Sequence, residues 1–218
     1  MDADVGGATR KDLLLIQFAK SPQPGQVKTR MTPRLSPEQA YDLHCELTRW
    51  TCRQLLSSGL GTVELSVVGG REHALFTECQ SMGVSRILRQ RGVDLGERMY
   101  NAIRCGLARY VNVILVGSDC PGIDASYLRQ AVEALRTAPV VLGPANDGGY
   151  VLIGARAIQP EMFKGIPWGG AQVFEKTIAT LAREGIHWEA LSHLADIDRP
   201  EDLPLWEALQ RDASIAPG

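Results

Sequence analysis

The segment Lys20–Arg30, which reads KSPQPGQVKTR, could bind the phosphates of a nucleotide. It follows an apolar run and carries Gly25 together with Lys28 and Arg30, whose positive charges could offset those of phosphate groups. It is not a Walker A loop, because no glycine directly precedes Lys28, and it is not a GxGxxG dinucleotide loop. A solvated surface loop is the alternative, and composition alone leaves both interpretations open.

Asp119 is a candidate metal ligand because it directly follows a second apolar run. The segment Gly117–Gly122 reads GSDCPG, so the carboxylate precedes a proline-glycine turn. Hard cations such as Mg²⁺ and Mn²⁺ prefer such oxygen ligands and can bridge to substrate phosphates. The alternative is an Asx-turn, in which Asp119 only stabilises its own loop.

Further aspartates follow two later predicted strands. Asp147 lies in GPANDGGY, and its Asp-Gly-Gly sequence is also a hairpin turn signal. Asp196 and Asp198 lie in DIDRPEDL, and alternation in a strand would put both on one face, where one could reach a metal. Asp198 also fits a helix N-cap pattern, and the two roles are compatible.

Other common catalytic patterns are missing from the sequence. The four histidines form no HxxxH or HExxH group, and His44, inside a predicted helix, is interpreted as structural. No GxSxG motif supports a serine hydrolase. The five cysteines form no CxxC pair, which favours reduced thiols, and Cys120 is expected to be a buried, inert thiol.

The elements that must position these residues alternate along the chain. Apolar runs predict strands over 13–19, 62–68, 84–88, 111–117, 140–143, 150–154 and 186–191. Caps and helical spacing predict helices over 37–58, 71–82, 95–110, 124–136, 172–183 and 200–209. This alternation predicts a single-domain, three-layer α/β/α fold with a mostly parallel twisted sheet over residues 11–211. The ends, 1–10 and 212–218, are expected to be flexible. Such sheets bind ligands outside the carboxyl ends of their strands.

Composition limits the classes of function that the chain can have. The 218 residues are 44% hydrophobic and 22% charged, with a formal net charge of −2. No sequence-wide basic field favours nucleic acid or an anionic membrane. No apolar run approaches the ~20 residues of a membrane helix, and the first residues do not resemble a signal peptide. We therefore expect a soluble, cytoplasmic protein.

These four loops, together with the segment DLGERM at Asp94–Met99, resemble the nucleotide-diphospho-sugar transferase superfamily, whose fold is the Rossmann-like glycosyltransferase A-type. The resemblance rests on FAKSPQPGQVKTR, DLGERM, GSDCPG, GPANDGGY and DIDRPEDL, which follow one another over nearly the whole chain. Within that superfamily the sequence resembles a bacterial family of glycosyltransferases, some named for arsenosugar biosynthesis. That family is related to molybdenum-cofactor and phospholactate nucleotidyltransferases.

The resemblance implies roles for individual residues. Nucleotide binding is implied for Lys20, Gly25, Lys28, Arg30, Gly96, Arg98 and Asp119. Acceptor binding is implied for Asp147, Gly148 and Gly149, and metal binding for Asp119 and Asp198, with Asp196 the less favoured of the final pair. Asp119, Lys28 and Asp147 are the implied catalytic residues, with Asp147 as a candidate general base.

Three hypotheses for function follow from this resemblance. The leading one is sugar transfer from a nucleotide-sugar to a small-molecule acceptor with Mg²⁺ or Mn²⁺, which is favoured because proline replaces the glycine-rich loop of many nucleotidyltransferases. The second is nucleotidyl transfer from a nucleoside triphosphate with release of pyrophosphate, and the third is a non-catalytic nucleotide-binding module. No nucleic acid partner is expected, and a homo-oligomer is compatible with the sequence.

Overall fold

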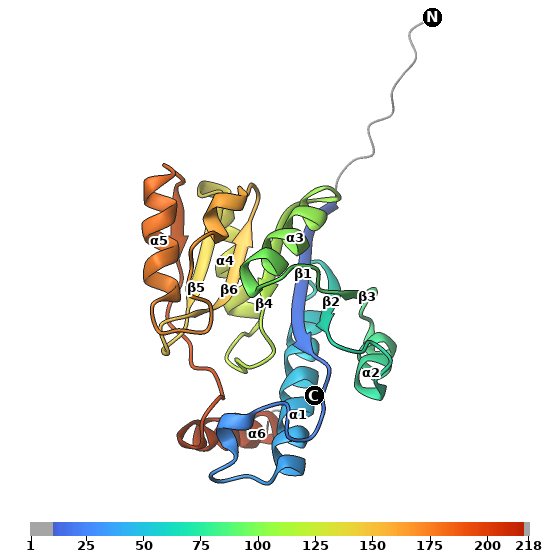
Figure 1. Cartoon of the computed structure of the whole chain (residues 1–218). Helices are drawn as coiled ribbons and strands as arrows, with labels where there is room; N and C mark the ends of the chain where they lie inside the picture. The colour runs from blue at the N-terminus through green and yellow to red at the C-terminus, as the bar shows by residue number, and fades with distance from the viewer. Residues whose placement is uncertain (1–10, 216–218) are drawn as a thin grey trace, which may run out of the picture.

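A seven-stranded sheet forms the centre of the computed structural model, which describes residues 11–215 (Figure 1). The strand order is β3-β2-β1-β4-β6-β5-β7. Only β6 runs antiparallel to its neighbours, β4 and β5. The predicted α/β fold with a mostly parallel sheet is therefore confirmed. The strands are β1 Lys11–Lys20, β2 Thr62–Val68, β3 Arg86–Arg89, β4 Tyr110–Val116, β5 Val140–Pro144, β6 Tyr150–Ala155 and β7 Trp188–Ala190.

Helices cover both faces of the sheet and create two separate apolar cores (Figure 1). α1, α2 and α4 pack on one face, and α3 and α5 pack on the other. The central strands β1, β4, β5 and β6 are largely apolar on both faces because helices cover both. The helices are α1 Pro37–Ser57, α2 Ala74–Met82, α3 Leu95–Leu107, α4 Ala125–Thr137, α5 Val173–Arg183 and α6 Leu203–Ile215. Short 3-10 turns occupy Thr29–Met31, Pro160–Phe163 and Pro200–Asp202.

The helix starts predicted from the sequence are confirmed where a polar side chain caps the helix. Ser36 and Gln39 form the reciprocal capping box of α1. The carboxylates of Asp94 and Asp124 accept hydrogen bonds from backbone amides in the first turns of α3 and α4. These caps matter for function, because α3 and α4 each follow a loop at the carboxyl edge of the sheet.

The ends of some elements differ from the prediction. α3 ends at Leu107 instead of 110, because Tyr110 already belongs to β4 and pairs with Lys11 of β1. α2 begins only at Ala74, where His73 caps the helix. The last helix continues to Ile215, so residues 212–215, expected to be flexible, are helical. The expected flexible segments 1–10 and 216–218 lie outside the described residues.

A third apolar cluster lies at the carboxyl edge, where α6 packs against α1 and the loop after β1 (Figure 1). Ile197 is fully buried in this cluster beside Leu43, Leu47 and Trp206. The cluster fixes the segment before α6 against the loops after β1 and β4. No helix among residues 11–215 is long and apolar enough to cross a membrane.

Candidate functional site at the carboxyl edge

An ion pair between Lys28 and Asp119 joins the loops after β1 and β4. The Lys28 Nζ lies 2.8 Å from Asp119 Oδ1. β1 and β4 are neighbours in the sheet, although β2 and β3 lie between them in the chain. This is the point where the strand order changes direction, and open α/β sheets bind ligands in the crevice there. The two residues singled out from separate loops are therefore in contact at the expected place.

Lys28 is held in an unusual backbone conformation to make this contact. Its φ of 50° is the only positive value of a non-glycine residue within the described chain. Its side chain is 3% exposed, whereas that of Asp119 is 47% exposed. A left-handed non-glycine residue is disfavoured, and persists where the surroundings determine it. Lys28 therefore sits behind Asp119, and the partly open carboxylate faces outward.

Ile197 connects the same two loops to the final acidic segment. Its backbone N–H donates to the carbonyl of Asp119 at 2.8 Å. Its carbonyl accepts a hydrogen bond from the Nζ of Lys28. Because the Ile197 side chain is buried in the third apolar cluster, the neighbouring aspartates are held on either side of a fixed point.

Buried polar groups beneath the ion pair fix the loop after β4. The Gln17 amide donates to the Ser118 hydroxyl, which donates to the carbonyl of Phe18. From α1, the Trp50 indole N–H donates to the carbonyl of Pro121. Polar groups with buried partners of this kind hold a loop in one arrangement. Asp119 is thus positioned by β1 and α1 as well as by its own loop.

The charges around Asp119 keep its carboxylate ionised. Burial alone would raise the pKa of Asp119, but the charge and hydrogen bond of Lys28, followed by the charge of His44, together hold that pKa below its ordinary value. Burial lowers the pKa of His44, whose Nε2 lies 2.9 Å from the carbonyl of Lys20 and donates to it. His44 therefore has the structural role interpreted from the sequence.

An acidic cleft of about 310 Å³ opens beside this ion pair. Asp198 Oδ2 lies 2.6 Å from Arg30 Nη1, so two predicted residues meet in the cleft. Burial, and then the charges of Asp119 and Asp147, raise the pKa of Asp196 to about 7. The cleft is lined by Arg30, Asn146, Asp147, Gly169, Gly170, Ala171, Ala195, Asp196, Asp198, Arg199 and Asp202.

Asp198 is not the cap of the following helical turn. The carboxylate of Asp202 instead accepts hydrogen bonds from the backbone N–H groups of Asp198 and Arg199. The N-cap interpretation is therefore wrong for the Asp198 side chain, because Asp202 caps the turn from within. The segment of Asp196 and Asp198 is also not a strand in the structure. Ile197 fixes it by bonds to Asp119 and Lys28.

The Asp-Gly-Gly sequence forms a turn, and its aspartate lines the cleft. Asp147 Oδ1 accepts a hydrogen bond from Gly149 N–H, and the turn joins the antiparallel strands β5 and β6. Gly148 has φ 89°, and a Cβ there would lie 1.9 Å from the carbonyl oxygen of Ala171. The hairpin interpretation is therefore confirmed, while Asp147 also lines the cleft. Gly148 and Gly149, predicted to bind the acceptor, are not in the lining of the cleft, although Gly148 closely approaches Ala171 of its wall.

Of the residues predicted to bind a nucleotide, only Arg30 lines the acidic cleft, and Lys28 and Asp119 are not part of its lining. Lys20 ends β1 and donates to the carbonyl of Gln26, and Gly25, with φ 73°, forms a turn in the same loop. Arg98 donates to the carbonyl of Gly92. Gly96 is buried under Trp168, whose ring atoms would lie 2.5 Å from a Cβ.

Several residues of this edge were not predicted from the sequence. Trp168, next to the Gly169–Ala171 wall of the cleft, covers Gly96 at the start of α3 and stacks at 6.5 Å on the ring of Phe163. It belongs to the sequence Pro-Trp-Gly-Gly, whose proline and glycines are a turn signal that could have indicated a loop near the site. Asn146, Arg199 and Asp202 lie inside the segments GPANDGGY and DIDRPEDL, but nothing in the sequence distinguishes them from their neighbours there.

The carboxylates fit a cation that is held by few protein ligands. No group of three His, Cys, Asp or Glu side chains within the described residues is arranged to hold a metal ion by itself. Mg²⁺ usually binds one or two carboxylates and completes its shell with water and substrate phosphates. Asp119, which is half exposed, and Asp198, at the rim of the cleft, offer such carboxylates. The charges of Asp119 and Asp147 help to raise the pKa of Asp196, which shows that negative charge is concentrated here.

The sheet order and the paired loops at its switch point define a protein with the nucleotide-diphospho-sugar transferase fold. A protein from Desulfovibrio desulfuricans G20, described as a nucleotide-diphospho-sugar transferase, matches with a TM-score of 0.81 at 29% identity, over 94% of this chain and 90% of its own. The 4-diphosphocytidyl-2C-methyl-D-erythritol synthase from Anaerococcus prevotii DSM 20548 shares only the fold, with a TM-score of 0.62 at 9% identity over 92% and 99% of the two chains. The predicted fold and superfamily are confirmed.

The family of the chain is shown by residues 51–170. They match the family described as uncharacterized protein conserved in bacteria (DUF2064), and the chain belongs to this family. The 3-phospho-D-glycerate guanylyltransferase of Phenylobacterium zucineum (strain HLK1) is 35% identical to this chain over 111 residues. That match spans 46% of this chain and 49% of the guanylyltransferase, about half the length of each. These relatives are transferases, the class expected from the sequence.

Proposed function

We propose that this protein is a metal-dependent nucleotidyltransferase that acts on a nucleoside triphosphate and a small-molecule acceptor. The observation that carries the proposal is the contact between Lys28 and Asp119 at the switch point, next to the acidic cleft. Support also comes from the curated relative, whose name describes a guanylyltransferase. Both hypotheses for transfer use the same groups, but this relative favours the nucleotidyl reaction.

Asp119 and Asp198 are the residues that would hold Mg²⁺ or Mn²⁺ in this proposal. The ion would offset the charge of the triphosphate and orient its phosphates. Asp119 suits the role because its pKa is held low while nearly half of its side chain remains exposed. Arg30, which is 56% exposed, could turn from Asp198 towards a phosphate.

The transfer step has a simple balance of bonds. An oxygen of the acceptor forms a bond to the α-phosphorus, and the bond from that phosphorus to the bridging oxygen breaks. Pyrophosphate leaves, and the acceptor's proton passes to a base, for which Asp147 at the wall of the cleft is the candidate. Positive side chains near the leaving group stabilise its charge, which is the usual protein contribution to phosphoryl transfer.

Lys28 is proposed as a positioning residue instead of a direct phosphate ligand. With a side chain only 3% exposed, its ammonium reaches Asp119 and the carbonyl of Ile197 but is covered from the outside. It would orient Asp119 and keep it ionised. This changes the role implied by the family resemblance, in which the basic loop contacts phosphates directly.

A second candidate function is sugar transfer from a nucleotide-sugar. The description of the Desulfovibrio desulfuricans protein favours it, since that protein is 29% identical over nearly all of this chain. The same carboxylates would act on a diphosphate, and a nucleoside diphosphate would leave. The two reactions therefore differ in the product that carries the phosphates.

The test measures the leaving group. The protein is incubated with GTP, CTP, UTP or ATP, with Mg²⁺ or Mn²⁺, and with 3-phosphoglycerate as the first acceptor probe. Parallel reactions contain nucleotide-sugars. Metal-dependent release of pyrophosphate that is lost in Asp119→Asn supports nucleotidyl transfer, whereas release of a nucleoside diphosphate supports sugar transfer. Nucleotide binding without turnover for any acceptor in a broad panel would instead identify a nucleotide-binding module.

A further inference from the structure

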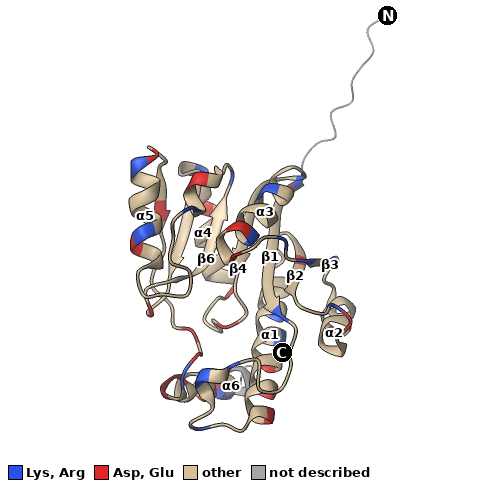
Figure 2. Cartoon of the chain, in the orientation of Figure 1, with Lys and Arg blue, Asp and Glu red and all other residues tan. Residues whose placement is uncertain are grey.

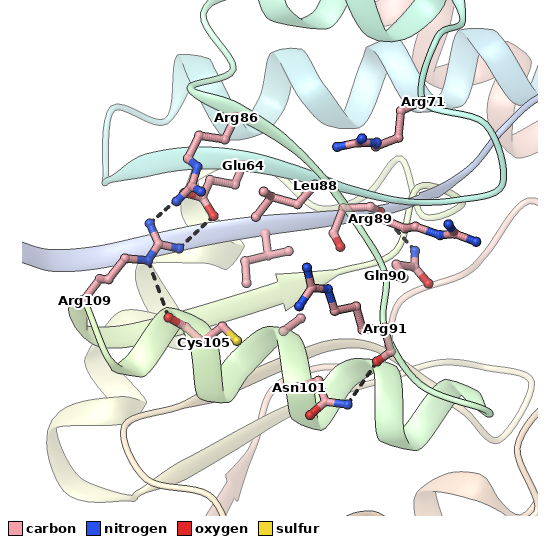
Figure 3. A pocket seen from close by; sticks show the side chains of 13 residues that line it. Glu64, Arg71, Arg86, Leu88, Arg89, Gln90, Arg91, Asn101, Cys105 and Arg109 are labelled. Atoms are coloured by element: carbon pink, nitrogen blue, oxygen red, sulfur yellow. Dashed lines mark hydrogen bonds and ion pairs between the residues drawn. The ribbon is translucent and has the colours of Figure 1, made fainter.

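A second cavity, of about 480 Å³, lies on the face of the sheet beside α3, over β2 and β3 (Figure 3). Five arginines line it, and they come from the loop after β2, from β3 and the residues that follow it, and from the turn between α3 and β4. We call it the arginine pocket, defined by Arg71, Arg86, Arg89, Arg91 and Arg109. Its volume is in the range that holds a small organic molecule.

The only acidic residue in the lining of the arginine pocket, Glu64, neutralises one end of it. The Glu64 side chain is 2% exposed and accepts two hydrogen bonds, at 2.8 and 2.9 Å, from the Arg109 guanidinium. Arg86 lies 3.8 Å from the same carboxylate. Figure 3 shows both guanidinium groups converging on Glu64. This end of the pocket is therefore a satisfied structural ion cluster.

The other end of the arginine pocket carries unneutralised positive charge. Within residues 11–215, Arg71, Arg89 and Arg91 have no carboxylate within ion-pair distance. All three are exposed, yet they line one cavity in a protein whose formal net charge is −2. Like charges brought together in this way repel each other unless an anion binds between them. Figure 2 shows the gathering of basic residues at β3 and the segments beside it.

The backbone that carries Arg91 is anchored to the helix across the pocket. The Asn101 side-chain amide on α3 donates to the carbonyl of Arg91 at 3.0 Å. The preceding residue, Gln90, donates from its side chain to the carbonyls of Ala19 and Ser66. Figure 3 shows the Arg91 guanidinium in the space between α3 and the strands. The basic end is thus held by two polar side chains instead of lying on a free loop.

Protection of the sheet edge explains only part of this arrangement. β3 is an edge strand, and charged side chains on edge strands prevent pairing with other molecules. That function accounts for Arg86 and Arg89. It does not account for Arg71 or Arg91, which belong to loops outside β3 and still line the same cavity.

The arginine pocket is separate from the carboxyl-edge site. Glu64 pairs in the sheet with Ile16, four residues before the end of β1, so the pocket runs along the face of the sheet. No residue lines both this pocket and the acidic cleft. The side chain of Gln90, bonded to the carbonyl of Ala19, lies between the pocket and the end of β1.

We propose that the arginine pocket binds a small anion that carries two or more phosphate groups. One guanidinium group can donate two parallel hydrogen bonds to two oxygens of a phosphate. Three guanidinium groups in this pocket have no carboxylate partner among the described residues. The apolar side chains of Ile16 and Leu88 in the lining suit the carbon skeleton of an organic phosphate. The concave shape and limited volume favour a small molecule over an acidic protein.

Cys105 offers a local probe of the arginine pocket. It lines the cavity and is the one exposed cysteine of five, since the other four are buried. Alkylation by iodoacetamide, a neutral reagent, is followed by intact mass in the presence of inorganic tripolyphosphate. At about ten times its dissociation constant the anion should slow alkylation about tenfold, because only empty pockets react. Sulfate at equal ionic strength controls for salt.

The decisive variant is Arg71→Gln with Arg91→Gln. Both side chains are exposed and lack an ion pair, so the folded state should be retained, which circular dichroism and the melting temperature verify. The half-protecting concentration of tripolyphosphate should rise about tenfold or more, the loss expected for two charge-assisted contacts. The matched control is Arg53→Gln with Arg129→Gln, which removes the same charge from α1 and α4 on the opposite face and should leave protection unchanged.

Three outcomes would overturn the proposal. The first is no protection of Cys105 by tripolyphosphate beyond that of sulfate. The second is equal protection in the double arginine variant and its control, which would show a general charge effect. The third is protection by poly-glutamate but not by tripolyphosphate, which would indicate an acidic protein partner. None of these results depends on turnover, so the failure of this proposal is distinct from the failure of nucleotidyl transfer.

Discussion

The acidic cleft and the arginine pocket are opposite in charge and differ in construction. The acidic cleft contains four aspartates and two arginines, and every residue of its lining lies in loops or turns beyond the strands. The arginine pocket contains five arginines and one glutamate, and it lies along β2, β3 and α3, although Arg71, Arg91 and Arg109 come from the adjoining loops. Loops alone form the acidic cleft, whereas regular elements and the loops beside them together form the arginine pocket.

The largest expected effect is the loss of activity in Asp119→Asn. Removing the carboxylate should lower turnover by about a hundredfold to a thousandfold, since a group that stabilises transition-state charge contributes that much. Pyrophosphate release measures the effect under the proposed reaction. Glu175→Gln, an exposed change on α5, is the control and should keep full activity. Activity retained in Asp119→Asn would remove Asp119 from the site.

Gly148→Ala should disrupt the acidic cleft while leaving the arginine pocket intact. A Cβ would lie 1.9 Å from the Ala171 carbonyl oxygen, at a backbone φ of 89°. We expect a loss of about 3 kcal/mol in the free energy of unfolding, the cost of strain together with overpacking. Gly25→Ala, with φ 73° and nothing within 4 Å, should cost only about 1 kcal/mol. Urea denaturation compares the two, and equal costs would contradict the clash.

Glu64→Gln should destabilise the arginine pocket without affecting the cleft. It leaves Arg109 and Arg86 with a neutral partner in a nearly buried position. We expect a loss of about 2 kcal/mol, below the full cost of a broken buried pair because Arg109 is 36% exposed. Glu78→Gln, which breaks an exposed pair with Arg49, should cost less than about 1 kcal/mol. Chemical denaturation measures both, and similar losses would mean that Glu64 is not a structural centre.

The smallest effect concerns the pH dependence contributed by His44 at the carboxyl edge. Burial lowers its pKa below the ordinary 6.5, so the unfolded chain binds a proton there more readily than the folded chain. Stability should therefore be highest above the unfolded pKa and should fall as the pH drops below it. His44→Gln, which can still donate to the Lys20 carbonyl, should show a weaker decline between pH 7 and about pH 5. An unchanged decline would assign it to other groups.

The fold could be predicted from the sequence because its signals are local. Apolar runs, proline and glycine punctuation, and capping residues such as Ser36 and Asp124 indicated nearly every element. The antiparallel direction of β6 follows from the Asp-Gly-Gly hairpin. The end of α3 could not be predicted, because the pairing of Tyr110 with β1 decides it.

The sequence predicted which residues belong to the candidate site but not which of them are in contact. The strand-end rule brought Lys28 and Asp119 to one edge, yet the burial of Lys28 depends on its left-handed backbone and on Ile197. Nothing in the order of residues could show that Trp168 covers Gly96. The arginine pocket was not predicted at all, because its residues follow no shared motif and meet only when β2, β3 and α3 pack.

Ile197 makes the candidate site depend on a helix that contributes no residue to it. The family match over residues 51–170 includes Asp119 but neither Lys28 nor Asp198. The bonds that hold these residues together pass through the backbone of Ile197, whose side chain needs Trp206 of α6 as a packing partner. A substitution in α6 that removes Trp206 should therefore loosen the contacts around Asp119 and leave the two cores of the sheet in place, since Trp206 belongs to neither core.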